Sequence, residues 1–308
     1  MRQGEAASKS RWMGNPLGGV KAPEALILPD PATRFMRTAA RLDVYSVGHP
    51  MAEWLRFMAR LARAQHVAAA ALTPSRPNQS AIDQAVEARM PPLAADGHRR
   101  DSAWRDGLAV LLDELGKTAM PASARAVIET LRDRETGALE ALAAEILHGA
   151  VASAETGAAL YVAAALQVYF TRLAAELPAS SLRLLPQRGL CPCCGSTPVA
   201  GVVTASGQTP GTRYLHCSLC STGWNHTRAV CITCGESRSL ALRGIDGDSG
   251  AVKAETCDAC HTYAKMLYQA RDTTVDPFAD DLATLGLDIL TAEAGWARHA
   301  PNLLLLIG

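Results

Sequence analysis

The sequence has no excess of charge of either sign, since 30 lysines and arginines are balanced by 30 aspartates and glutamates. It therefore lacks the basic field that attracts nucleic acid or anionic lipid non-specifically. Aromatic residues are also scarce, at 5% of the chain. Alanine and leucine dominate the first half instead, which favours helix there.

No apolar stretch is long enough to cross a bilayer. The longest, TGAALYVAAALQVYF at 156–170, contains Gln167 and falls short of the roughly 20 apolar residues that a spanning helix needs. We expect a buried helix there and no membrane insertion. The N-terminus, MRQGEAASKSRWMGNPLGG, lacks the apolar core of a signal peptide. We therefore expect a cytoplasmic protein, whose thiols stay reduced.

The common patterns of a catalytic site are missing as well. The sequence contains no Ser/His/Asp or nucleophile-elbow pattern, no P-loop and no GxGxxG. We therefore predict that the protein is not an enzyme.

The chain is longer than one average domain, and its composition changes near Leu184. We expect an α+β protein: a flexible arm, an all-α helical domain, and two small tandem metal lobes of short strands and knuckles, the second ending in a C-terminal helix and tail. The expected bounds are 1–29, 30–185, 186–228 and 229–308.

Local signals mark two helix starts. Asp30 followed by Pro31 is typical of a cap and a first-turn proline, and Asp276 followed by Pro277 repeats the pattern before the last helix. We expect that last helix to bury an apolar face made of Phe278, Leu282, Leu285 and Ile289. The tail NLLLLIG (302–308) is too apolar for solvent and is expected to dock against a domain.

All nine cysteines lie between Cys191 and Cys260. Eight of them form four CxxC pairs, and the pattern C-x2-C-x22-C-x2-C occurs twice at a fixed offset, so that Cys191 recurs as Cys231. Gly195 recurs as Gly235 at the same offset. The pairs are Cys191 and Cys194, Cys217 and Cys220, Cys231 and Cys234, and Cys257 and Cys260.

Two residues between thiolates let a tight turn aim both sulfurs at one ion, and two such turns complete a tetrahedral site. Four thiolates select zinc, iron or an iron–sulfur cluster over hard cations. Disulfide-linked hairpins and redox dithiols are the alternatives to metal. Sequential grouping of the pairs within each repeat is the simple arrangement, and interleaved grouping of first with third and second with fourth is its rival.

Several other residues fall near these pairs. Cys193 has Thr233 as its repeat counterpart; we interpret it as a spare thiol, with an oxidation-sensitive thiol that links two copies as the alternative. His216, His226 and His261 are expected outside the ligand sets, because eight cysteines already fill two shells. We interpret Asp280 and Asp281 as a solvated helix face, and Trp224 as a core aromatic.

Beyond the spacing, the stretches CPCCGSTPV, RYLHCSLCSTGW (213–224), KAETCDACHTYAKMLYQ (253–269) and DPFADDLATLGLDI (276–289) closely resemble the formate dehydrogenase accessory protein family, FdhE. The resemblance is strong over about residues 185–308. The helical part agrees in length and character, without a short motif of its own.

The resemblance implies a cytoplasmic protein that respiratory formate dehydrogenase needs for activity and that binds its catalytic subunit before export. It implies two rubredoxin-like lobes, similar to zinc ribbons, that hold iron, with zinc as the alternative. The implied ligands are Cys191, Cys194, Cys217, Cys220, Cys231, Cys234, Cys257 and Cys260. Cys193 departs from the family's CPxCGS form only at its variable position.

Two other functions compete with a maturation factor. A rubredoxin-type electron carrier would use the same iron sites, but a long helical region is unusual for one. A zinc-ribbon nucleic-acid module would need a basic surface, whereas in 188–270 basic and acidic residues are mixed.

Overall fold

The computed structural model describes residues 22–207, 209–300 and 302–305. The chain forms a helical region followed by a strand-rich region and two closing helices, which confirms the expected α+β class. The helices are α1 Arg34–Ser46, α2 Ala52–Ala71, α3 Gln79–Glu87, α4 Ala103–Gly116, α5 Ala122–Arg132, α6 Thr136–His148, the short 3-10 helix Ser153–Glu155, α7 Thr156–Ala175, α8 Ala279–Ala283 and α9 Leu285–Glu293. The strands are β1 Leu26–Ile27, β2 Pro198–Val203, β3 Arg213–Cys217, β4 Gly223–Asn225, β5 Leu240–Arg243, β6 Val252–Cys257, β7 Thr262–Tyr268 and β8 Ala297–Arg298.

Helix α7 is the centre of the helical region. It packs against α2, α4, α5 and α6, and residues 161–171 are all buried. By length and composition alone, Ser153–Ala175 is apolar enough to cross a membrane, but 78% of its most apolar window is buried inside the protein. Gln167 is accommodated because its amide donates to the Ser218 carbonyl, at 2.7 Å, and accepts from Gln65. The buried helix predicted at 156–170 is therefore present.

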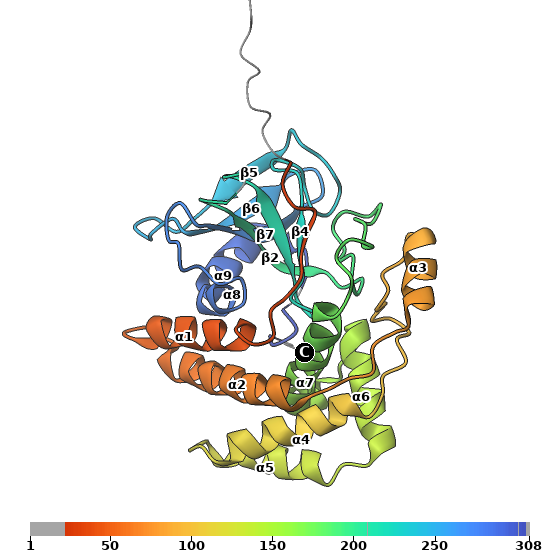
Figure 1. Ribbon diagram of the computed structural model, residues 1–308. Coiled ribbons are helices and arrows are strands. Elements are labelled where there is room, and N and C mark those ends of the chain that lie inside the picture. The colour runs from red at the N-terminus through yellow and green to blue at the C-terminus, as the bar shows by residue number, and fades with distance from the viewer. Residues whose placement is uncertain (1–21, 208, 301, 306–308) are drawn as a thin grey trace, which may run out of the picture.

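The strands of the two cysteine-rich segments join in one sheet. The strand order is β1-β4-β3-β2-β7-β6-β5, with β8 beside β7. Strands β2, β3 and β4 recur in the second repeat as β5, β6 and β7, and each trio is antiparallel. Parallel pairing of β2 with β7 joins the trios, with Gly201 opposite Met266. The repeat is thus a shift along one continuous sheet, seen above the helices in Figure 1.

The start of the chain corrects one expectation. Leu26 and Ile27 pair with Trp224 and Gly223, so β1 covers the outer edge of the first trio. Residues 22–29 are therefore not part of a flexible arm; the remainder of that predicted arm, 1–21, lies outside the described residues. Trp224 is 1% exposed and its indole N–H donates to the Arg188 carbonyl, which confirms it as a core aromatic.

The predicted last helix is two helices, α8 and α9, separated at Thr284. Asp276 does cap the first, since its Oδ1 accepts from the backbone N–H groups of Phe278 and Ala279. Phe278 and Leu282 are buried as expected, but Ile289 is 59% exposed, because the break rotates the second half of the predicted face outward. In the tail, Leu304 joins the core as expected; residues 306–308 lie outside the described residues.

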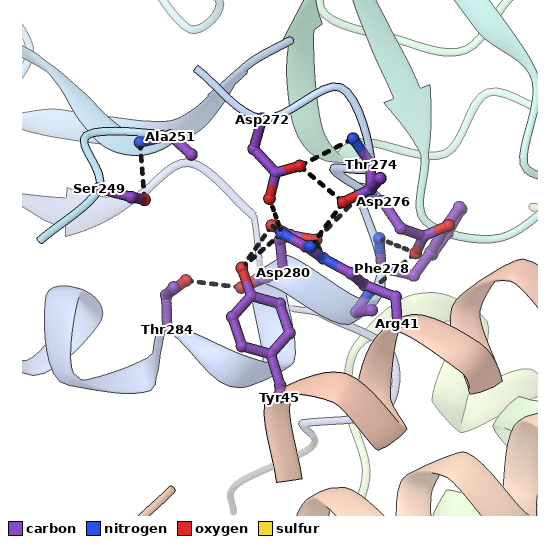
Figure 2. Close-up of polar contacts among 11 residues, drawn as sticks. Arg41, Tyr45, Ser249, Ala251, Asp272, Thr274, Asp276, Phe278, Asp280 and Thr284 are labelled. Carbon is purple, nitrogen blue, oxygen red and sulfur yellow. Dashed lines mark hydrogen bonds and ion pairs between the residues drawn. The ribbon is translucent and has the colours of Figure 1, made fainter. Parts of the chain in front are cut away.

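Asp280 and Asp281 are not solvated, and that interpretation was wrong. Both are 0% exposed. Asp280 accepts from Arg41 and from the Tyr45 hydroxyl, the latter at 2.6 Å, so it ties α8 to α1; Figure 2 shows Arg41 between Asp272 and Asp280. Asp281 faces Lys265 and Arg298. These cationic side chains explain why the two aspartates are buried, although the sequence pattern predicts that they face solvent.

Candidate metal centres

The first CxxC of each repeat forms the same backbone knuckle. The Cys191 N–H donates to the Ser196 carbonyl at 2.9 Å, and the Gly195 N–H donates to the Cys191 carbonyl at 2.8 Å. The second repeat makes the same two bonds around Cys231, at 2.8 and 3.1 Å. Gly195 and Gly235 adopt φ of +80° and +79°. This left-handed conformation favours glycine, which explains why it follows both pairs.

The second CxxC of each repeat follows a strand. Strand β3 ends at Cys217, and the chain then turns back so that the N–H groups of Leu219 and Cys220 point at the Cys217 sulfur, at 3.4 and 3.3 Å. The residue after each pair, Ser221 or His261, has a φ of +62° or +53°. N–H groups directed at a sulfur stabilise its thiolate form. The knuckles therefore present sulfur atoms ready to bind a cation.

The eight sulfurs gather in two groups of four, within 4.8 Å of one another in each group. Cys191, Cys194, Cys217 and Cys220 make one group, and Cys231, Cys234, Cys257 and Cys260 make the other. The grouping is sequential within each repeat; the interleaved alternative is not the one in the structure. All nine cysteines are free of disulfides.

The spacing of the sulfurs fits a tetrahedral ion. Cys191 and Cys220 lie 3.5 Å apart, and Cys194 and Cys217 lie 3.4 Å apart. In the second group the matching distances are both 3.7 Å. Four sulfurs at about 2.3 Å from one ion would lie about 3.8 Å apart. Both groups therefore match the size of a tetrahedral thiolate shell, and the second matches it best.

Comparisons with known proteins match three consecutive parts of the chain. Family models described as FdhE N-terminal, FdhE central domain and FdhE C-terminal domain match residues 23–186, 190–228 and 229–305. The chain belongs to the FdhE family. A Protein FdhE homolog from Edwardsiella ictaluri is 39% identical over 92% of each chain. Protein FdhE from Escherichia coli K12 is 36% identical over 92% of this chain and 91% of its own.

A solved structure is similar over the same extent. The crystal structure of the FdhE protein from Pseudomonas aeruginosa has a TM-score of 0.84 and 34% identity, and the match covers 92% of this chain and 99% of that one. The resemblance to the FdhE family predicted from the cysteine-rich half therefore holds for the helical region as well.

The two groups in this member of the FdhE family differ in solvent access. All four cysteines of the first group are at most 1% exposed, whereas Cys234 is exposed and Cys260 is partly exposed. Burial raises the pKa of Cys191 and of Cys217 well above the ordinary thiol value. Burial therefore disfavours the charged form of these two thiols, and a bound cation would offset that cost. The second group lies near enough to the surface for an ion bound there to exchange with solvent.

A threonine bonds to the last sulfur of each group. Thr222 Oγ1 lies 3.2 Å from Cys220 Sγ, and its repeat counterpart Thr262 lies 3.1 Å from Cys260 Sγ. These two threonines were not among the predicted site residues, although they are related by the same offset as the cysteines. Hydrogen bonds of this kind orient the ligand and adjust its basicity.

Cys193 is fully buried, with 0% exposure. It therefore offers no surface thiol for an intermolecular disulfide, and the structure contradicts the alternative interpretation of this residue. His216, His226 and His261 stand outside both sulfur groups among the described residues, as expected. His216 and His226 have pKa values lowered to about 4 by burial, so both rings are neutral at physiological pH.

Proposed function

We propose that this protein is an accessory factor that respiratory formate dehydrogenase needs for activity, and not an enzyme itself. In this proposal it binds the catalytic subunit in the cytoplasm, before export. Membership of the FdhE family across the helical, central and C-terminal parts carries the proposal, because the sequence resemblance links that family to formate dehydrogenase. The pair of four-cysteine groups in this chain supports it.

We further propose that each group holds one iron ion, with zinc as the alternative. The ligands would be Cys191, Cys194, Cys217 and Cys220 in one site, and Cys231, Cys234, Cys257 and Cys260 in the other. Iron bound there would supply a one-electron couple, whereas zinc would supply only structural support. Four protein ligands close the shell, so neither ion would activate water. By binding one ion together, the four cysteines of each group would hold the strand ends and knuckles in place. The short strands bury too little apolar surface to do this without the metal.

Deletion of the gene in its host, followed by a formate dehydrogenase assay on membranes, tests the accessory role. We expect activity to be lost and to return when the gene is supplied in trans. A Cys231→Ser, Cys260→Ser double variant tests whether the second group is needed, with Ser249→Ala, an exposed turn residue, as the matched control. Normal activity in the deletion strain would contradict the accessory role.

The metal is identified by elemental analysis and the visible spectrum of anaerobically purified protein. We expect two metal ions per chain and the red colour of iron–thiolate charge transfer. Colourless protein with two zinc ions would show that the metal is zinc and not iron, and would leave the accessory role unaffected. Co-purification of the catalytic subunit from cytoplasm, but not from membranes, tests the partner and its compartment. A reversible couple without any effect of deletion on the dehydrogenase would favour the electron carrier.

A further inference from the structure

A cavity of about 480 Å³ lies where the linker before Cys191 meets the start of the second repeat. This volume is within the range of small-ligand sites. No aspartate or glutamate is among the described residues that line it, and the polar side chains include those of Arg188, His226, Thr233 and His299. Cys231, from the more exposed sulfur group, forms part of the wall.

His226 offers a hydrogen-bond donor to this cavity. Its Nδ1 lies 2.6 Å from Arg213 Nη2 and 3.0 Å from the Thr227 carbonyl. The guanidinium can only donate, and two N–H groups facing each other at 2.6 Å would repel, so we assign Nδ1 as the acceptor in this shorter contact. The neutral ring then carries its proton on Nε2, which has no partner among the described residues. Burial, aided by the charge of Arg213, lowers the pKa of His226 to about 4 and keeps the ring neutral. Arg188, with one bond of 3.1 Å to the Asn225 carbonyl, has further N–H groups to donate.

His299 offers a hydrogen-bond acceptor to the cavity. Its Nε2 is buried and has no hydrogen-bond partner among the described residues. Its Nδ1 lies 2.7 Å from Thr233 Oγ1, which lies 2.8 Å from Thr262 Oγ1. Thr262 in turn contacts Cys260 Sγ at 3.1 Å. A chain of three hydrogen bonds therefore connects the cavity wall to a sulfur of the second group.

A metal-bound thiolate can only accept, and this fixes the direction of the chain. Thr262 then donates to Cys260, Thr233 donates to Thr262, and His299 Nδ1–H donates to Thr233. The neutral His299 ring is left with a bare lone pair on Nε2. A buried acceptor without a partner is costly, so a ligand that donates a hydrogen bond there would gain affinity.

We propose that this cavity binds a small oxyanion that still carries a proton, of the hydrogen carbonate or dihydrogen phosphate type. Its hydroxyl donates to His299 Nε2, and its oxygens accept from His226 Nε2–H and Arg188. Because His299 leads through Thr233 and Thr262 to Cys260, the occupied cavity changes the hydrogen bond at that sulfur. The second metal centre therefore responds to the ligand, since hydrogen bonds to a metal-bound sulfur tune the centre.

The first repeat has the same inner bond but no such opening. There Thr222 contacts Cys220, and the position of Thr233 is taken by Cys193, which is 0% exposed. No histidine continues the chain among the described residues. In the first repeat the hydrogen-bond network therefore ends inside the core, at Cys193. In the second repeat Thr233 and His299 extend it to the cavity, so only the second metal centre should respond to the oxyanion.

Calorimetric titration of the metal-loaded full chain with hydrogen carbonate and with inorganic phosphate, against chloride at equal ionic strength, tests binding. We expect saturable binding of at least one of the two oxyanions, and their relative affinities identify the better fit. His299→Phe and Arg188→Gln should each weaken it by roughly tenfold or more, the size of one lost hydrogen bond to a buried or charged group. His148→Phe and Arg183→Gln, outside the cavity, should leave it unchanged.

Cobalt(II)-substituted protein tests the connection to the metal centre. The cobalt–thiolate absorption bands should shift on addition of the oxyanion. At an oxyanion concentration that saturates each variant, Thr233→Val should abolish the shift, because it breaks the chain between His299 and Cys260, and Thr233→Ser should restore it. Absence of binding by either oxyanion, equal binding by His299→Phe and wild type, or a full spectral shift in Thr233→Val would each overturn the proposal. None of these readouts depends on formate dehydrogenase.

Discussion

Arg213 Nη1 lies 2.7 Å from Glu255 Oε1 and joins strand β3 of the first repeat to strand β6 of the second. The arginine side chain is 1% exposed and the glutamate 12%. Nη2 also faces the Val230 carbonyl, at 2.7 Å, and the Thr227 carbonyl in the connection between the repeats. One buried guanidinium therefore holds both repeats and the segment that connects them.

Replacement of Arg213 by methionine should destabilise the sheet strongly. The change leaves Glu255 and two carbonyl groups without their donor, and breaking a buried ion pair costs about 3–5 kcal/mol. We expect a clear fall in the urea midpoint. An Arg213→Met, Glu255→Leu double variant should recover part of the loss, because it removes the unpaired charge. Arg238→Met, at an exposed position, is the control; an equal fall there would contradict the role of Arg213.

Metal release should occur in two phases. Cys234 is exposed, whereas the first group is buried throughout, so a chelator should remove one ion per chain quickly and the other slowly. Local access of this kind sets exchange rates more than overall stability does. Cys234→Ser should remove the fast phase, and its repeat counterpart Cys194→Ser the slow one. Release followed with a chromophoric chelator would show a single phase if the two sites were equivalent.

Cys193 should be dispensable for metal binding and for oligomeric state. Cys193→Thr copies the residue at the equivalent position of the second repeat, so we expect two metal ions per chain and a loss of less than about 1.5 kcal/mol. Cys194→Ser, at the neighbouring position, should lose a metal ion. Non-reducing electrophoresis after air oxidation should give the same pattern for Cys193→Thr and wild type, and a dimer band that disappears only in this variant would argue against the buried position.

The sequence predicted what depends on local spacing. The constant offset between the two repeats located the sulfur groups, and the first knuckle of each repeat is closed by a glycine, Gly195 or Gly235. The long apolar run at 156–170 correctly predicted a buried helix. These features depend on contacts between near neighbours, or on one strong periodic signal.

What the sequence did not predict depends on long-range contacts. Nothing in the spacing indicates that β2 pairs with β7, because strand edges are alike until tertiary packing selects a partner. A strand as short as β1 carries no periodic signal at all. Asp281 follows the rule for a solvated helix start, and only Lys265 and Arg298, which come from other elements, make its burial favourable.

The same carboxylate should give the protein a dependence on acid pH. Asp281 is 0% exposed and accepts from Asn302 Nδ2 at 2.6 Å, while Lys265 Nζ lies 3.3 Å away. Burial by itself would raise the pKa of Asp281, but the charges of Lys265 and Arg298 outweigh it and hold the pKa below the usual 3.8. A carboxylate with a lowered pKa stabilises the fold at all pH values above its unfolded pKa, and this contribution is lost as pH falls through the folded pKa.

Asp281→Asn should therefore be less stable than wild type at neutral pH, by about 1–3 kcal/mol, since Lys265 and Arg298 lose one charged partner and keep only Asp288. The gap should stay constant down to about pH 4 and narrow below it, because only the wild type then has a proton to take up at this site. Urea midpoints of both proteins across this range measure the gap, and release of metal by acid affects both alike. Asp246→Asn, in an exposed turn, should follow wild type throughout; a gap that widened on acidification would mean that Asp281 is protonated in the folded protein.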